Sequence, residues 1–180
     1  MKQTPLIAQH RAAWAKLVDF AGWEMPIQYS GVLDEYHAVR NKAGLFDVSH
    51  MGRLMVSGAG ALVFLQSVTT NNVAKLAVGQ AHYSMVCNHE GGIKDDIFVY
   101  RLKPADYLLC VNASNRAKVL TWLQAHLCDA GVVLEDHSDR MAQIAMQGPS
   151  SRDIMLALGG AAVTTLKLHY TCEAMLASIP

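Results

Sequence analysis

The sequence predicts an α+β protein in which helices cover one face of an antiparallel sheet. Two observations predict this class. From Gly52 the hydrophobic period changes to two, and apolar runs and amphipathic segments then follow in the order β-α-β-β-β-α-β up to residue 137. The turns "NHEGG" and "KPAD" between the three middle runs are too short for a parallel crossover, so these strands are expected to be antiparallel neighbours.

This order divides the chain into two predicted domains. Residues 52–137 are predicted to form an inserted domain with the ferredoxin-like α+β pattern. Residues 1–51 and 138–180 are predicted to form part of a flanking α+β domain. The sequence ends on the apolar run "EAMLASIP", without a polar tail, and we therefore expect a fragment of a longer protein.

The first 51 residues are predicted to hold two helices and a loop. A helical pattern covers residues 8–18, and "GVLDEYHAVRNKAG" predicts a second helix over residues 33–42 with Gly44 at its C′ position. Between them, "FAGWEMPIQYSG" places three aromatic side chains in a segment rich in Gly and Pro. So much apolar surface predicts a loop that folds inward.

The inserted domain begins with the strand "RLMVSG" and the helix "GAGALVFLQSVTTN", and three strands follow in "HYSMVC", "IKDDIFVYRL" and "YLLCVNA". Ser114 or Asn115 is predicted to cap a helix that runs to about Cys128 and stops before Gly131. "VVLEDH" supplies the last strand of this domain. After it, "MAQIAMQGPSSRDIMLALGG" predicts a strand, a tight turn and a helix with Pro149 near its first turn.

Charge and cysteine content exclude several classes of partner. Lys and Arg number 15 and are balanced by 15 Asp and Glu with no charge run, so we expect neither a nucleic-acid nor a membrane-surface partner. No segment approaches the ~20 apolar residues of a membrane span, and the N-terminus lacks the apolar stretch of a signal peptide. The cysteines lie far apart and are expected to be reduced thiols in a cytoplasmic protein: Cys87, Cys110, Cys128 and Cys172.

Two adjacent carboxylates in "GGIKDDIFVY" are the first candidates for chemistry. If residues 93–102 form a strand, Asp96 shares a face with Phe98 and Tyr100, while Asp95 points to the opposite face. The two carboxylates therefore cannot converge on one substrate atom as a catalytic dyad does. One Asp beside two aromatic rings could hold a cationic or planar ligand. The alternative is that both carboxylates only solvate the start of an edge strand.

Other familiar sites are not predicted. In "DVSHMG", Ser49 and His50 are neighbours on an extended segment and point apart, so His50 is expected to be structural or to line a ligand rather than to form a hydrolase triad. The eight His are scattered without metal-ligand spacing, and no metal is expected. "SGAGA" lacks the lysine and glycines of nucleotide-binding loops. Asn112, after "YLLCV", could face a flat heterocycle or form an ordinary Asx turn.

The motifs "DFAGWEMP", "GLFDVSHMG", "GGIKDD" and "IAMQGPSS" resemble the glycine cleavage T-protein family of tetrahydrofolate-dependent aminomethyltransferases. The resemblance runs from Thr4 to about Leu158 and is loose over the last twenty residues. It implies that the one-carbon unit on the lipoyl arm of H-protein passes to tetrahydrofolate with release of ammonia. It also implies that residues 1–51 and 138–180 belong to an incomplete first folate-binding domain.

The same resemblance implies roles for individual residues. Asp96 corresponds to the catalytic carboxylate near the reacting folate nitrogens, where it can stabilise positive charge and orient those nitrogens. The positions that correspond to the family's folate cavity are Met51, Tyr83, Tyr100, Val111 and Asn112. Asp95 is left to the turn or to the opposite face of the strand.

Family members have a longer chain of three domains, and this sequence stops before their "GYTGEDG"-type segment, a later Arg and a C-terminal β-barrel. The resemblance is therefore to the N-terminal portion. Two alternatives stay open. One is a non-catalytic folate-binding relative, such as the iron-sulfur assembly proteins whose "KGCYxGQE"-type motif is absent here. The other is a truncated chain that only docks H-protein.

Overall fold

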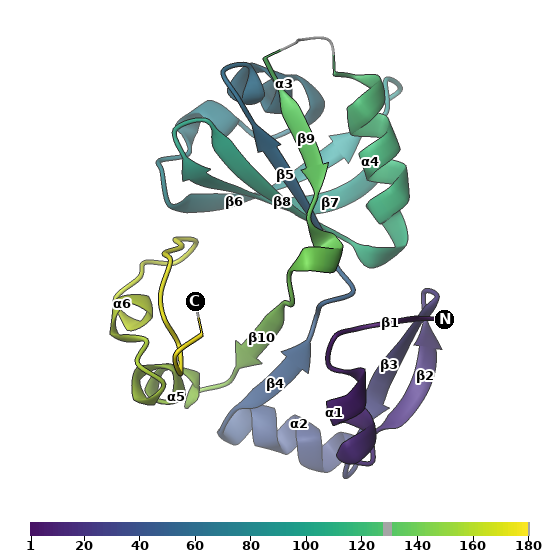
Figure 1. Ribbon diagram of the computed structural model, residues 1–180, viewed down its shortest axis with the longest axis vertical. Helices are drawn as coiled ribbons and strands as arrows, with labels where there is room; N and C mark the ends of the chain where they lie inside the picture. The colour runs from purple at the N-terminus through teal and green to yellow at the C-terminus, as the bar shows by residue number, and fades with distance from the viewer. Residues whose placement is uncertain (128–130, 180) are drawn as a thin grey trace. The chain divides into compact units, whose positions relative to one another are not determined.

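The computed structural model describes residues 1–127 and 131–179. These residues group into two compact units, drawn in Figure 1. Unit 1 consists of Met1–His50, Ala142–Thr165 and Glu173–Pro180, and unit 2 consists of Met51–Met141 and Leu166–Cys172. None of the helices in the described part of the chain combines the length and the hydrophobicity that a membrane span requires.

Unit 2 is built on a five-stranded sheet in which all neighbouring strands are antiparallel. The strands lie side by side in the order β6-β7-β8-β5-β9. Their bounds are β5 Gly52–Ser57, β6 Gln80–Cys87, β7 Ile93–Lys103, β8 Asp106–Val111 and β9 Val133–Asp136. Because β6, β7 and β8 are consecutive neighbours, the antiparallel meander predicted from the short turns is confirmed.

Two helices of unit 2, α3 (Ala61–Val68) and α4 (Arg116–Ala125), pack on the same face of this sheet. Leu65 of α3 and Leu123 of α4 share one hydrophobic core with alternate strand residues such as Ile97. Alternate residues of a strand point to one face, so both helices must lie on that face. This confirms the predicted α+β layer with helices on one side.

Helix α4 begins where it was predicted to begin, but its cap and its end differ from the prediction. Asn115 occupies the N-cap position, but its side chain makes no hydrogen bond to the helix and instead donates to Asp95. The helix ends at Ala125 with His126 at the C-cap, and Cys128, the predicted end, lies outside the described residues. The described part of unit 2 also contains short 3-10 helices: η1 Val73–Lys75, η2 Ala113–Asn115 and η3 Ser138–Arg140.

In its described residues, unit 1 contains two small sheets and four helices, and Figure 1 labels them. In the first sheet, β3 pairs in parallel with β1 and antiparallel with β2; in the second, β4 and β10 are antiparallel. The strands are β1 Lys2–Gln3, β2 Lys16–Phe20, β3 Trp23–Gln28, β4 Gly44–Asp47 and β10 Ile144–Gln147. The helices are α1 Ile7–Ala12, α2 Val32–Asn41, α5 Ser151–Ala157 and α6 Ala161–Thr164.

Two sequence predictions for unit 1 are wrong. The helix expected over residues 8–18 ends at Ala12, because Trp14 adopts a left-handed φ of 57° and the chain then enters β2. The segment "FAGWEMPIQYSG", expected to be a loop, is largely strand β3, which pairs with β2 as a hairpin. Its Gly and Pro residues suggested a loop, but pairing with β2 holds the segment in an extended strand conformation. The helix predicted over residues 33–42 is confirmed as α2, although Gly44 begins β4 rather than capping α2.

The strand, turn and helix predicted for residues 141–160 are confirmed as β10 and α5. Gly148, in the turn between them, has φ 114°. A Cβ at this position would lie 2.6 Å from the carbonyl oxygens of both Val39 and Lys42. The backbone can approach the end of α2 this closely only with glycine at the turn.

Candidate functional site

The Asp96 carboxylate lies on the face of β7 opposite α3 and α4, and it is exposed. Tyr83, on the neighbouring strand β6, donates from its Oη to Asp96 Oδ2 at 2.8 Å. Asn112, directly after β8, donates from Nδ2 to Asp96 Oδ1 at 2.9 Å. Three adjacent strands therefore bring three of the predicted site residues together, and each oxygen of the carboxylate accepts from a neutral donor.

Aromatic rings line the sheet beside this carboxylate. The ring centroid of Phe98 lies 5.7 Å from that of Tyr83 and 6.0 Å from that of Tyr100, as the strand alternation predicted for this face. His169 joins them from outside the meander, with its ring edge-on to Phe98 at 5.9 Å and its carbonyl accepting from Ala81 N at 2.7 Å. An aromatic surface beside a carboxylate can bind a flat ligand that carries or develops positive charge.

Both tyrosines of this face are held in the protonated form. The hydrogen bond to Asp96 raises the pKa of the Tyr83 hydroxyl, because ionisation would remove the donor and place a second negative charge beside the carboxylate. Burial raises the pKa of the Tyr100 hydroxyl, and Cys110 adds to the effect. At neutral pH Tyr83 therefore remains a hydrogen-bond donor to Asp96.

Asp95 lies on the helix-covered face and is 2% exposed. Its Oδ2 accepts from the backbone N–H of Asn112 at 2.9 Å. Its Oδ1 accepts from Asn112 Nδ2 at 2.9 Å and from Asn115 Nδ2 at 2.5 Å. The strand alternation correctly separated the two carboxylates, but it gave no sign that Asn112 contacts both of them.

Two further residues predicted to bind folate, Val111 and Met51, do not join the hydrogen bonds that the described residues form around Asp96. The Val111 side chain is fully buried in the core beneath α3 and α4, so any contact between Val111 and a ligand on the Asp96 face would have to use its backbone. Met51 comes directly before β5 and is partly buried, and its carbonyl accepts from Arg53 Nη1 at 2.6 Å. No hydrogen bond among the described residues joins Met51 to Asp96.

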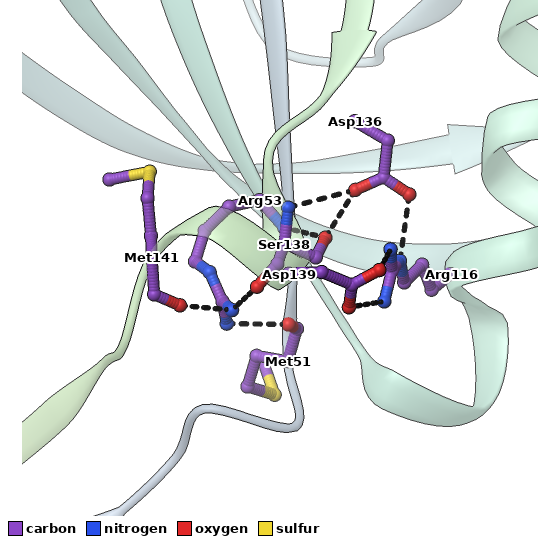
Figure 2. Close-up of polar contacts among 7 residues, drawn as sticks. All are labelled: Met51, Arg53, Arg116, Asp136, Ser138, Asp139 and Met141. Atoms are coloured by element: carbon purple, nitrogen blue, oxygen red, sulfur yellow. Dashed lines mark hydrogen bonds and ion pairs between the residues drawn. The ribbon is translucent and has the colours of Figure 1, made fainter. Parts of the chain in front are cut away.

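The Arg53 side chain joins the residue before β5 to the residue after η3, as Figure 2 shows. Its side chain is buried, and besides the Met51 carbonyl it donates to the carbonyls of Ser138 and Met141. Burial lowers the pKa of Arg53, though an arginine stays charged at neutral pH. In the sequence the only sign of this role is an arginine inside an otherwise apolar strand, and Arg53 was not among the predicted site residues.

A second cluster of charged groups closes the same end of unit 2 (Figure 2). Arg116 donates to Asp136 at 2.8 Å and in bidentate fashion to Asp139 at 3.0 and 3.1 Å. Asp136 in turn accepts from the backbone and hydroxyl of Ser138. These contacts tie the start of α4 to η3 and stabilise the end of the sheet at which Met51 lies.

Unit 1 contains a chain of hydrogen-bonded polar residues that was not predicted from the sequence. Nε2 of His10 lies 2.8 Å from Asp47 Oδ2, and Nδ1 lies 2.8 Å from the Tyr29 hydroxyl. A carboxylate only accepts, so a neutral His10 carries its proton on Nε2 and accepts from Tyr29 at Nδ1. Burial alone would raise the pKa of Asp47, but hydrogen bonds from His10 and Ser49 contribute to a net lowering.

Tyr29 and Asp47 also line a mainly apolar cavity of about 540 Å³ between β3, α2 and β4. None of the residues predicted to bind folate lines this cavity.

Ser49 forms two hydrogen bonds with the backbone of Gln143: its hydroxyl accepts from the Gln143 N–H at 3.0 Å and donates to the Gln143 carbonyl at 3.2 Å. Ser49 therefore serves to join two backbone segments of unit 1. In the described part of the chain, no three His, Cys, Asp or Glu residues form a group that could hold a metal ion.

Comparison with known proteins gives the family. The family model described as "GCVT N-terminal domain" matches residues 6–180. The aminomethyltransferase of Lysinibacillus sphaericus (strain C3-41) is 46% identical over 167 residues, which cover 93% of this chain and 46% of the relative. That of Prosthecochloris aestuarii (strain DSM 271 / SK 413) is 51% identical over 156 residues, covering 86% of this chain and 43% of the relative.

A solved structure agrees with the fold. The crystal structure of glycine cleavage system aminomethyltransferase T from Bartonella henselae matches with a TM-score of 0.89 and 33% sequence identity, over 94% of this chain and 46% of that chain. The chain thus spans less than half the length of the relatives and of the structure that it matches. The matches confirm the resemblance seen in the sequence motifs, and the chain belongs to the GCVT N-terminal domain family.

Proposed function

We propose that this chain is the N-terminal part of a tetrahydrofolate-dependent aminomethyltransferase of the glycine cleavage system. The substrate is the aminomethyl group on the lipoyl arm of H-protein. Its carbon forms two bonds to nitrogens of tetrahydrofolate while its bonds to sulfur and to its own nitrogen break. The two protons lost from the folate nitrogens leave on the dihydrolipoyl thiol and on ammonia.

The observation that carries this proposal is the Asp96 carboxylate on an exposed, aromatic-lined face in a chain of this family. Asp96 is the catalytic residue of the proposal, because a carboxylate there can stabilise positive charge that develops at the transferred carbon and orient the folate nitrogens. Tyr83 and Asn112 hold its two oxygens. The flat pteridine would lie against the aromatic face that includes Tyr100, with Met51 and the backbone of Val111 at its margins.

The domain assignment is part of the same proposal. Residues 52–137 would form the inserted ferredoxin-like domain, and residues 1–51 and 138–180 an incomplete first folate-binding domain. The grouping of residues into two compact units supports it, with the difference that Met51, residues 138–141 and Leu166–Cys172 lie with the insert. The remaining half of a full-length relative would supply further contacts to folate and to lipoylated H-protein.

The test combines binding and turnover. Tetrahydrofolate is titrated against this chain and against a fusion that adds the remaining half of the Lysinibacillus relative. The fusion is then mixed with aminomethyl-loaded H-protein and tetrahydrofolate, and ammonia release is followed. We expect Asp96→Asn to slow ammonia release by about 10²-fold or more, while Asp106→Asn, elsewhere in the same sheet, leaves it unchanged.

An unchanged rate in Asp96→Asn would show that Asp96 is not the catalytic carboxylate. Tetrahydrofolate binding by the fusion without any ammonia release would instead support a non-catalytic folate-binding relative. Binding of H-protein without tetrahydrofolate binding would support a docking role alone.

A further inference from the structure

Asp95 is a buried carboxylate for which neither the family comparison nor the proposed chemistry supplies a role. It lies at the start of a strand face that continues with the apolar side chains of Ile97 and Val99. A carboxylate at such a position is costly unless donors satisfy it. Three N–H groups do so, and all three belong to Asn112 and Asn115 in the short segment between β8 and α4.

The Asn112 amide joins this buried carboxylate to the exposed one. Nδ2 of Asn112 lies 2.9 Å from Asp95 Oδ1, 2.9 Å from Asp96 Oδ1 and 3.1 Å from the backbone carbonyl oxygen of Asp96. The amide nitrogen has two hydrogens, and carboxylate oxygens only accept, so the NH₂ end of the amide must face both aspartates. With the amide reversed, its oxygen would lie against two carboxylates, which is electrostatically unfavourable.

A ligand bound on the exposed face could displace the contact between Asn112 and the Asp96 carboxylate, but not the contact between Asn112 and Asp95. Asp96 is exposed, so a cationic or hydrogen-bonding ligand on this face competes for its oxygens. Asp95 is 2% exposed and keeps its contacts whatever binds on the other face. Its bond to the Asn112 backbone N–H also fixes the position of the residue, not only that of the side chain.

We propose that Asp95 is a positioning residue that acts through Asn112. It holds the Asn112 amide with its NH₂ group directed at Asp96, so that the catalytic carboxylate meets its substrate in one fixed orientation. Preorganisation of this kind lowers the barrier because the groups need not be ordered during the reaction. The buried Asp95 therefore positions the Asn112 amide, and this amide positions the exposed Asp96. This inference rests on the proposed function only for its effect on turnover.

The first test is independent of activity. In the 180-residue chain labelled with ¹⁵N, the side-chain NH₂ of Asn112 is assigned by NMR and its hydrogen exchange is measured. We expect Asp96→Asn to leave the exchange slow, because Asp95 and the backbone carbonyl of residue 96 still accept from the amide. Asp95→Asn is expected to speed the exchange by about tenfold or more, the factor for one lost net hydrogen bond. Asn115→Ala, which removes a different donor to Asp95, is the matched control and should change it little.

Loss of protection in Asp96→Asn, or no change in Asp95→Asn, would overturn the positioning role. The Asp96→Asn arm needs no substitution of a buried residue, so the result does not depend on whether Asp95→Asn folds. If the fusion proves inactive, the proposed function fails while these NMR results still decide the role of Asp95.

The second test is a double-mutant cycle on ammonia release by the fusion described above. We expect Asp95→Asn and Asn112→Ala each to lower kcat by about tenfold to 10²-fold, and the double variant to be no slower than Asn112→Ala alone. A residue that only stabilised the fold would instead show independent, multiplying effects. Multiplying effects would therefore contradict action through Asn112.

Discussion

Tyr83 donates a 2.8 Å hydrogen bond from its phenol to Oδ2 of Asp96 across neighbouring strands. Tyr83→Phe removes this donor and keeps the ring. Because Tyr83 is 48% exposed, the stability of the fold should change little, and the loss should appear in turnover. We expect kcat for ammonia release by the fusion to fall roughly threefold to tenfold, measured against Tyr170→Phe as a control. Equal losses in both variants would contradict a specific role for the phenol.

The same hydrogen bond predicts a pH dependence. The pKa of Tyr83 is raised, so its phenol loses its proton only above the ordinary tyrosine value of about 10. Asp96→Asn removes the adjacent negative charge and is expected to lower the pKa of Tyr83 toward that value. Alkaline titration of the Tyr83 ring by NMR measures the shift directly. A pKa that does not move in Asp96→Asn would show that the carboxylate is not its cause.

Asp47 is expected to stabilise unit 1 in its ionised form. Its folded pKa is lowered, so its contribution is complete above the ordinary carboxyl pKa of about 3.9 and is lost as the pH falls through the lower folded value. Asp47→Asn should reduce the free energy of unfolding at pH 7 by about 1–3 kcal/mol, the cost of a buried donor left without its partner. The difference from wild type should begin to shrink below pH ~4, where Asp47 of the unfolded chain binds a proton, and should be lost once the pH falls through the lower pKa of the folded state.

Urea unfolding in a Trp122→Phe background measures this effect, because the remaining fluorescence comes from Trp14 and Trp23 of unit 1. Glu173→Gln, a change at an exposed carboxylate, is the control and should stay within about 0.5 kcal/mol of wild type. A constant difference between Asp47→Asn and wild type from pH 7 down to pH 2 would contradict the ionised role.

Arg53→Lys tests the buried guanidinium of Figure 2. A lysine keeps the charge, but one ammonium cannot reproduce the planar fork that donates to the carbonyls of Met51, Ser138 and Met141. We expect unit 2 to lose about 2–4 kcal/mol of unfolding free energy, followed by Trp122 fluorescence in urea in a background in which Trp14 and Trp23 are replaced by Phe. Arg152→Lys, at an exposed position of α5, should have no measurable effect.

Trp14 is 90% exposed and adopts φ 57°, a conformation that costs a non-glycine residue about 1–2 kcal/mol. Trp14→Gly is therefore expected to stabilise unit 1 by about 1 kcal/mol after the entropy cost of glycine. Ala13→Gly is the matched control, because Ala13 has an ordinary φ of −86° and gains nothing in return. It should destabilise by roughly 0.5–1 kcal/mol, with both changes read from urea unfolding by circular dichroism. Destabilisation by Trp14→Gly would show that the tryptophan makes a compensating contact.

Local sequence patterns predicted correctly those features of the fold that depend on residues close together in the chain. The period of two in "IKDDIFVYRL" placed Asp96 with Phe98 and Tyr100 and separated it from Asp95, because successive strand residues must alternate. Turns of four or five residues were enough to predict the meander, since no longer connection was available. The sequence motifs also identified the family, which the comparisons confirm.

Tertiary structure decided what depends on partners distant in the chain. Residues 13–28 fit a helix and a loop when read alone, and became a hairpin because β3 pairs with both β1 and β2. The contacts of Asn112 with both aspartates, and the approach of His169 to Phe98, join residues 16 or more positions apart. The sequence by itself determined that the two carboxylates lie on opposite faces of the strand, and the family resemblance pointed to Asp96. Only folding showed that Asp95 is buried and Asp96 exposed, and brought both the donors that hold them, because hydrogen bonds between strands depend on register and not on spacing along the chain.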